Sequence, residues 1–186
     1  MAILHIALMG NKILMEKSKK ISDPTEPEYK KLAKDMQETL EHIGANGLAA
    51  PQVHVPERLV VYRIAAHQIP PESNMKPIPW RVLINPIVTP QTDEVKPIWE
   101  RGLSLPGLHG EVPRYTKVQL TAQQLDGSKI EIKASGFHAM LLQHECDHLD
   151  GVLYPMQMID ISTLSFDTEL GDSRFYIPRS AEEFME

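Results

Sequence analysis

The chain contains 186 residues, a length that is typical of one domain with a core of its own. We therefore expect a single domain over residues 1–186, with a variable tail over residues 160–186. The net charge of −6 provides no basic surface for a phosphate backbone, so nucleic acid is not an expected partner. The one cysteine, Cys146, excludes an intrachain disulfide and fits a reducing compartment, for which we expect the cytoplasm.

The first nine residues, MAILHIALM, are apolar and predict a buried N-terminal segment. They lack the charged region and the small-residue cleavage site of a signal peptide. A membrane-spanning helix needs about 20 apolar residues, so we expect no membrane partner.

A helix is predicted from residue 25 to residue 43. Thr25 as N-cap and Glu28 three residues later would form a capping box, and Gly44 would end the helix. Apolar residues recur inside it at spacings of three and four, which gives one core-facing stripe. These residues are Leu32, Met36, Leu40 and Ile43.

Several stretches rich in β-branched and aromatic residues follow, and they predict strands. The alternation of apolar and polar residues is clearest on the two sides of Asp126-Gly127, a dipeptide that indicates a hairpin. One helix, many strands and a second, buried helix predict an α+β fold, in which a mainly antiparallel sheet packs around that second helix. The predicted strands cover residues 57–65, 80–89, 94–100, 117–125 and 129–134.

The second helix is predicted over FHAMLLQHECDHLDG, between Ser135 as N-cap and Gly151 as the C-terminal stop. It contains the pattern H-E-x-x-H. His144 and His148 lie four positions apart on one helix face, so both imidazoles can reach one metal ion. Glu145, next to the first histidine, can hold and deprotonate a water that the metal activates. The apolar run before the motif predicts that this helix is buried, and buried His and Glu side chains need partners.

Three stretches, taken together, resemble the peptide deformylase family. The family pattern G-φ-G-φ-A-A-P-Q, in which φ is apolar, stands here as ANGLAAPQ over residues 45–52. The pattern E-G-C-L-S stands as ERGLS over residues 100–104, and residues 143–151 match Q-H-E-x-D-H-L-x-G fully. The resemblance covers about residues 12–158. It implies the fold of the family and a metal-dependent amidase that removes the formyl group from N-formylmethionyl peptides or nascent chains.

The resemblance also implies a set of catalytic residues. One divalent metal ion, Fe²⁺ or Zn²⁺, would be held by His144 and His148, with Glu145 as the general base and then the general acid. The Gln52 side chain and the backbone N–H of Leu103 would stabilise the oxyanion that forms on the formyl oxygen.

Four further residues are expected around the substrate. Ala45, Asn46 and Gly47 stand in the first motif, where the family binds its substrate. Glu100 would either contact the substrate or hold a metal ligand in position.

The sequence departs from the family pattern at the metal site. The cysteine ligand of the family falls at Gly102, which has no side chain. Arg101 puts a bulky charge where the family leaves room beside the substrate, and Asn46 replaces an apolar residue near the methionine pocket. Because an anionic thiolate is lost, we expect the metal to bind more weakly by orders of magnitude and the activity to be reduced.

Other groups could fill the third coordination position. His109 follows Gly102 by seven residues in a loop rich in Pro and Gly and could swing in, and His54 is a weaker candidate. A water molecule is the third possibility. Cys146 lies two positions from each histidine, about 200° round the helix, so we expect it to be a small buried apolar residue and not a ligand.

The leading hypothesis for the function is therefore a deformylase-like metallohydrolase with reduced activity. The alternative is a catalytically inactive module that binds a peptide N-terminus or another protein. A third hypothesis is an amidase or esterase for another acyl group, because Asn46 and Arg101 would suit a more polar substrate. Metal content separates the first two, since a pure binding module has no need of a filled metal site.

Overall fold

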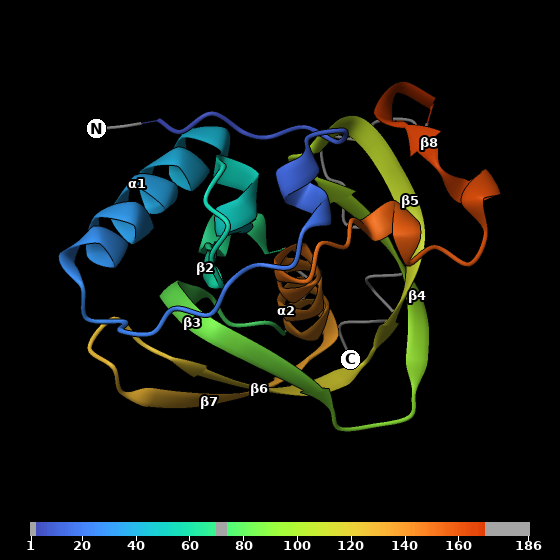
Figure 1. The fold of residues 1–186 in the computed structure, drawn as a ribbon. Helices are drawn as coiled ribbons and strands as arrows, with labels where there is room; N and C mark the ends of the chain where they lie inside the picture. Colours follow the sequence, from blue (N-terminus) through green and yellow to red (C-terminus); the bar gives the residue numbers. More distant parts are fainter. Residues whose placement is uncertain (1–2, 70–73, 170–186) are drawn as a thin grey trace.

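The computed structural model describes residues 3–69 and 74–169, and it shows two antiparallel sheets around one central helix (Figure 1). The strand order is β1-β2-β3-β6-β7 in the larger sheet and β4-β5-β8 in the smaller one. This arrangement confirms the predicted α+β class. Within the described residues, no helix is long and apolar enough to cross a membrane. The helices are α1 (Pro27–Ile43) and α2 (Gly136–Leu149), and the strands are β1 (Gly47–Ala49), β2 (Leu59–Ile64), β3 (Ile78–Pro90), β4 (Val95–Gly102), β5 (Leu105–Tyr115), β6 (Lys117–Gln123), β7 (Lys129–Ser135) and β8 (Ser165–Phe166).

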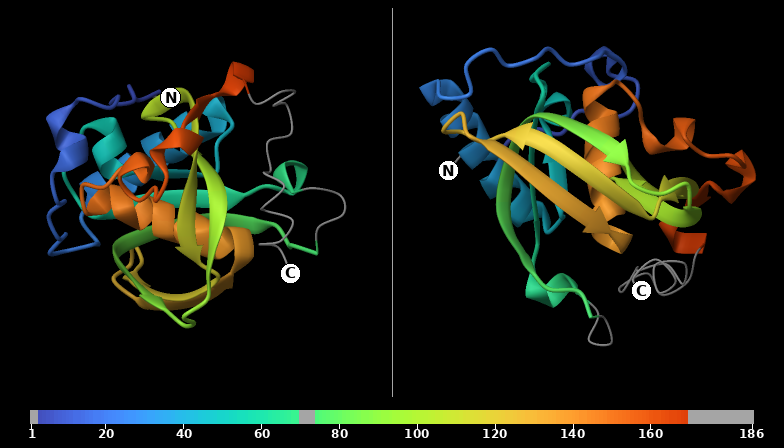
Figure 2. Two further views of the ribbon diagram at one scale, coloured as in Figure 1. Left: turned by 90° about the vertical axis from the view of Figure 1, so that its right-hand side faces the viewer. Right: turned by 90° about the horizontal axis from the view of Figure 1, so that it is seen from below.

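Helix α2 lies between the two sheets and is buried on almost every side (Figures 1 and 2). Eleven of its fourteen residues are buried, so the helix needs no amphipathic stripe. This explains the apolar run over residues 139–142 that precedes the two histidines. Ser135 takes the predicted N-cap position, although its side chain makes no capping bond, and Gly151 follows the helix with a φ of +75°.

Strand β2 of the larger sheet has a helix on each of its two faces. Along β2, Val60 and Tyr62 belong to the apolar cluster that includes α2. The intervening Leu59 and Val61 belong to the cluster that includes α1. Because successive side chains of a strand point to opposite faces, this alternation places the two helices on opposite sides of the sheet.

Helix α1 begins at Pro27, so the predicted capping box at Thr25 is wrong. The backbone N–H and the hydroxyl of Thr25 both donate to the Asp23 carboxylate, at 2.9 and 2.7 Å, in a turn before the helix. Glu26 occupies the N-cap position, and the fixed φ of proline suits the first helical residue. The predicted end is confirmed, because Gly44 closes the helix in the left-handed conformation at φ +79°.

The five predicted strands are confirmed with small shifts at their ends, but β1, β5 and β8 are not among them. The prediction that His109 lies in a loop is therefore wrong, because this residue is in the middle of β5. The prolines and glycines of LPGLHGEVPRY indicate a loop when they are considered locally. Pairing with β4 along nearly the whole strand overrides that local signal.

The N-terminal segment is not buried as predicted. Within residues 3–9 only Ala7 is buried, and Met9 is 55% exposed. The segment is held through its backbone, because the Ala7 N–H donates to the Gln52 carbonyl and the Met9 N–H donates to the Ser104 carbonyl, each at 2.8 Å. It therefore connects the segment around Gln52 with the turn around Ser104, and sequence analysis assigned both to the active site.

The start of the predicted tail adds a short third strand to the smaller sheet. Ser165 and Phe166 form β8 and pair with His109 and Leu108 of β5. The remainder of the predicted tail, including the acidic cluster at residues 182–186, lies outside the described residues.

The two helix-terminal glycines provide a test of this fold. Gly44 and Gly151 have similar φ angles, +79° and +75°, but a Cβ at Gly151 would lie 2.8 Å from the Met15 backbone, whereas at Gly44 it would meet nothing within 4 Å. We expect Gly44→Ala to lower the free energy of unfolding by about 1–2 kcal/mol, the cost of a left-handed residue. Gly151→Ala should lower it by a further ~1–3 kcal/mol, because backbone must move to relieve the overlap. Equal losses in urea unfolding would contradict this packing.

Candidate metal centre and active site

The two histidines of the H-E-x-x-H motif lie next to each other inside the molecule. His144 is 8% exposed and His148 is 2% exposed. Their ring centroids are 4.9 Å apart and the ring planes are nearly perpendicular, at 79°. The one-turn spacing on α2 thus brings both imidazoles to one place, where β1, the 3₁₀ helix η2 (Ala50–Val53) and β5 pack against the helix.

The ring of His144 is fixed by Glu100 of β4. The Nδ1 atom of His144 lies 2.7 Å from Oε2 of Glu100, so Nε2 is the nitrogen that remains for another partner. Burial lowers the pKa of His144, but the carboxylate of Glu100 outweighs this effect and leaves the pKa above its ordinary value.

His148 has no hydrogen-bond partner for either ring nitrogen among the described residues. Burial and the charge of His144 hold the pKa of His148 well below its ordinary value, so the imidazole is uncharged. Buried polar atoms are rarely left unpaired in folded proteins. A neutral imidazole with a free lone pair is the form that binds a metal ion, so this ring fits a metal ligand.

The carboxylate of Glu145 is also buried, and its Oε2 atom has no partner in the described part of the chain. Burial raises the pKa of Glu145 to about 7. The backbone of β1 approaches this group closely, because a Cβ at Gly47 would overlap the carboxylate. Glycine is therefore the residue that lets β1 and the glutamate lie side by side.

Gln52 and the turn between β4 and β5 form the next part of the site. The Oε1 atom of Gln52 accepts the Ala49 N–H at 2.9 Å, and its Nε2 donates to the Ser104 hydroxyl at 3.3 Å. Leu103 precedes this serine in the turn that joins the two strands. The structure thus brings Gln52 and Leu103 together, although they are about fifty residues apart in the sequence.

Arg114 of β5 connects the smaller sheet to α2, and sequence analysis assigned no role to it. Its guanidinium donates to both oxygens of Glu100, at 2.6 and 3.0 Å, and to Oδ2 of Asp147 at 2.6 Å. Although burial opposes ionisation, Arg114 and His144 lower the pKa of Glu100 to about 2. Because both oxygens of Glu100 are occupied in this network, the contacts favour a positioning role over contact with substrate.

Gly102 faces His144 at the end of β4. An ideal Cβ at this position would lie 3.7 Å from Nε2 of His144 and 3.8 Å from Cδ1 of Tyr154. These are ordinary van der Waals distances, so a Cβ atom would fit at this position. The Tyr154 ring stacks on the His144 ring, with centroids 6.4 Å apart and planes 23° from parallel.

The other candidate ligands lie elsewhere. His109 pairs across strands with Arg101, and its Nδ1 atom lies against the Asp167 carboxylate, on the opposite face of β5 from Arg114. His54 lies beside Asn11 near the N-terminal segment. Among the described residues, no three His, Cys, Asp or Glu side chains are grouped to hold a metal ion.

Cys146 packs in the main core, as expected for a small buried residue. Burial raises the pKa of its thiol, which keeps the sulfur protonated and unsuited to metal binding.

The donor atoms around His144 and His148 can be compared with those that a divalent metal ion requires. The imidazoles of His144 and His148 lie side by side, and neither ring nitrogen of His148 has a hydrogen-bond partner among the described residues. Glu145, which follows His144, has one carboxylate oxygen without a partner there. This donor set fits a divalent ion with two protein ligands, and Gly102, where the family resemblance implies a third one, has no side chain.

A sequence model of the family described as "Polypeptide deformylase" matches residues 3–163. The chain belongs to the peptide deformylase family. Among curated relatives, peptide deformylase 1 of Nitrosomonas europaea is 37% identical over 168 residues, which cover 90% of this chain and 94% of the relative. Peptide deformylase 1 of Prochlorococcus marinus is 40% identical over 171 residues, which cover 91% and 88%.

Solved structures of deformylases have the same fold. A class I type b peptide deformylase from Acinetobacter baumannii superposes with a TM-score of 0.78 at 27% identity, over 85% of this chain and 100% of the other. Peptide deformylase from Thermotoga maritima gives a TM-score of 0.74 at 28% identity, over 86% and 100%. Members of the peptide deformylase family are metal-dependent hydrolases, which agrees with the donor set around His144.

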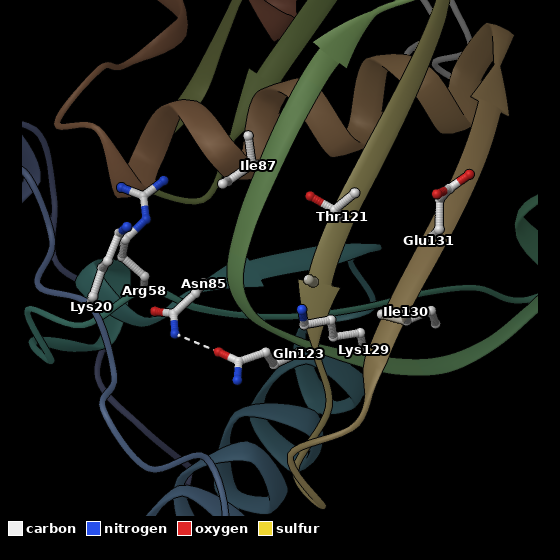
Figure 3. A pocket seen from close by; sticks show the side chains of 10 residues that line it. Lys20, Arg58, Asn85, Ile87, Thr121, Gln123, Lys129, Ile130 and Glu131 are labelled. Atoms are coloured by element: carbon white, nitrogen blue, oxygen red, sulfur yellow. Dashed lines mark hydrogen bonds between the residues drawn. The ribbon is translucent and has the colours of Figure 1, made fainter.

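A separate hollow of about 640 Å³ lies along β3, β6 and β7, with α2 behind the strands (Figure 3). Its polar groups serve the fold, because the Arg58 guanidinium donates to the Leu149 carbonyl at 3.1 Å and to Asp150 at 2.8 Å. None of its lining residues belongs to the deformylase site. These residues are Lys20, Arg58, Asn85, Ile87, Thr121, Ala122, Gln123, Lys129, Ile130 and Glu131.

The Arg114 network should stabilise the folded state far more than an exposed ion pair does. Removing the guanidinium in Arg114→Met would leave Glu100 with His144 as its remaining partner and take the arginine away from Asp147, and breaking a buried ion pair in this way typically costs about 3–5 kcal/mol. The control is Lys31→Met, which removes the 2.6 Å pair of an exposed lysine with Asp35 and should change the free energy of unfolding by less than about 0.5 kcal/mol. Urea unfolding of both variants measures the difference. A loss in Arg114→Met no larger than that in Lys31→Met would argue against the network.

Proposed function

We propose that this protein is a peptide deformylase whose metal ion has two protein ligands, His144 and His148. The reaction is hydrolysis of the formyl amide of N-formylmethionyl peptides, at the N-terminus of a nascent chain, with Fe²⁺ or Zn²⁺ as the metal. The observation that carries the proposal is the buried Glu145 carboxylate with one unpartnered oxygen, next to the two imidazoles. When bound, the metal supplies Lewis acidity, which polarises the formyl carbonyl and makes water easier to deprotonate.

Glu145 is the residue proposed to move the proton in this reaction. Its pKa of about 7 lets the carboxylate accept a proton from the attacking water near neutral pH. The same group then donates that proton to the departing amine of methionine. Because Gly47 has no Cβ, β1 can lie against the Glu145 carboxylate, and the buried Oε2 atom is left without a hydrogen-bond partner among the described residues.

Gln52 and Leu103 are proposed to stabilise the oxygen of the formyl group as it gains charge. The Gln52 amide is held on one side by the Ala49 N–H and on the other by Ser104, so its second N–H is oriented in advance. The backbone N–H of Leu103 would donate from the adjacent turn. Each such donor is typically worth about 2.7–4 kcal/mol in a transition state.

The peptide is proposed to bind along the end strands of the two sheets. Strand β1 ends the larger sheet and β4 ends the smaller one, so each has one edge without a neighbouring strand in the described residues. Ala45, Asn46 and Gly47 lie at the start of β1, where an extended substrate could add to the edge through backbone hydrogen bonds.

Glu100 acts in this proposal as a positioning residue. It accepts from Arg114 and holds Nδ1 of His144, which leaves Nε2 for the metal. The arrangement matches a common pattern in metal sites, where a carboxylate fixes the tautomer and direction of a histidine ligand.

Gly102 is the observation that favours the alternative, a binding module without hydrolysis. With two neutral ligands and no thiolate, the ion is held less tightly. A protein that loses its metal would retain the strand edges for peptide binding and lose the chemistry. Metal content and turnover therefore decide between the two functions.

We expect anaerobically purified wild type to turn over formyl-Met peptide slowly and to lose its metal on dialysis. Gly102→Cys should retain about one equivalent of metal and turn over faster, because a thiolate restores an anionic ligand in a position where a Cβ fits. Glu145→Gln in the Gly102→Cys background is the matched control. It should keep the metal and lose turnover by about 10²–10⁴-fold, the usual contribution of a general acid–base group.

Elemental analysis and single-substrate kinetics on the same samples provide both readouts. A metal-loaded Gly102→Cys protein without turnover would contradict the deformylase proposal and favour the binding module.

A further inference from the structure

Arg101 is an exposed cation on β4, next to the candidate active site. The residue before it, Glu100, contacts His144 on the inner face of the strand. Because successive side chains of a strand point to opposite faces, Arg101 points to the outer face. Its neighbour across the strands is His109, which lies on the opposite face of β5 from Arg114 and so agrees with this direction.

The charge of Arg101 is not neutralised within the described part of the chain. None of the ion pairs formed there includes its guanidinium. The Asp167 carboxylate, on the same face, lies against the buried His109 instead. Strand β4 also ends the smaller sheet, so its outer edge has no neighbouring strand in the described residues. An extended peptide that adds to this edge would meet an unpaired positive charge.

We propose that Arg101 selects formyl peptides in which the residue after methionine is acidic. The inference rests on the proposed function in one respect, the addition of the peptide as an extended strand at the edge of β4. It names the class of substrate that this edge prefers.

The alternation of side chains in an extended peptide assigns the selection to the second residue. Methionine is apolar, and the inner face of β4 provides apolar surface at Ile98, which packs with Met140 and Phe137 of α2. With the methionine side chain on this inner face, the next side chain points to the outer face, where Arg101 lies. The third side chain points inward again, away from the guanidinium.

The expected preference is modest, because the charge is exposed to solvent. Opposite charges on facing positions of paired strands typically change an equilibrium constant by about 1.5- to 5-fold, and like charges oppose pairing to a similar degree. Salt screens such exposed charges, so the preference should decrease as the ionic strength rises.

Binding of intact peptides measures this preference without relying on turnover. We expect the Glu145→Gln protein to bind labelled formyl-Met-Asp-Ala-Ala about 2–5-fold more tightly than formyl-Met-Asn-Ala-Ala in fluorescence anisotropy at low salt. Asp and Asn have nearly the same shape, so their ratio of dissociation constants isolates the charge. In 0.5 M NaCl the ratio should fall toward 1.

Three further variants in the same background locate the selecting charge. Arg101→Gln should bring the Asp/Asn ratio to about 1, whereas Arg101→Lys should keep most of it, because the charge remains. Lys133→Gln removes an equal charge from an exposed position of β7, at the other end of the larger sheet from β1, and should keep the ratio. Moving the acidic residue to the third position of the peptide should give a smaller ratio than at the second.

A ratio of 1 before Arg101 is changed, or an unchanged ratio in Arg101→Gln, would overturn the inference. The deformylase proposal would still stand in either case if the wild type hydrolyses formyl-Met peptides. Failure of every formyl peptide to bind would overturn this inference together with the proposed mode of peptide binding.

Discussion

The guanidinium of Arg114 is the interaction on which the rest of the site depends. It lies on β5 and binds Glu100 of β4 and Asp147 of α2, so it joins the smaller sheet to the central helix. Through Glu100 it also fixes the ring of His144. If one partner of such a buried network moves away, the others remain buried as charges without a partner, which is costly. This cost holds the side chains of the network in place. The direction of Nε2 of His144, the nitrogen proposed to bind the metal, thus follows from how the two sheets enclose the helix.

This rigidity explains how a deformylase site can keep its shape at Gly102. The network on one side and the packing of Gly47 against Glu145 on the other hold the proposed base, Glu145, and the proposed ligand, His144, without help from a cysteine. What the glycine removes is one negative charge and one strong bond to the metal. The consequence falls on metal affinity more than on the geometry of the remaining residues, so occupancy of the site becomes dependent on its surroundings.

The sequence was sufficient to predict the parts of the fold and site that depend on local spacing. The four-residue separation of His144 and His148 predicts two imidazoles on one helix face, and Asp126-Gly127 predicts its hairpin. Features that depend on tertiary pairing could not be predicted. Strand β5 looks like a loop until β4 pairs with it, and the partners of Arg114 are set by the register of that pairing. Family resemblance located Gly102, but the space beside it is visible only in the structure.

X-ray absorption at the Zn²⁺ edge tests the central claim most directly. In wild type loaded with one equivalent of Zn²⁺ in thiol-free buffer, we expect one shell of nitrogen and oxygen atoms, outer scattering from two imidazoles, and no sulfur. Gly102→Cys should add one sulfur at about 2.3 Å, the usual Zn–S distance. A third imidazole in the wild type would show that another histidine completes the site. A sulfur shell in the wild type would assign that role to Cys146, and either result would contradict a site with two protein ligands.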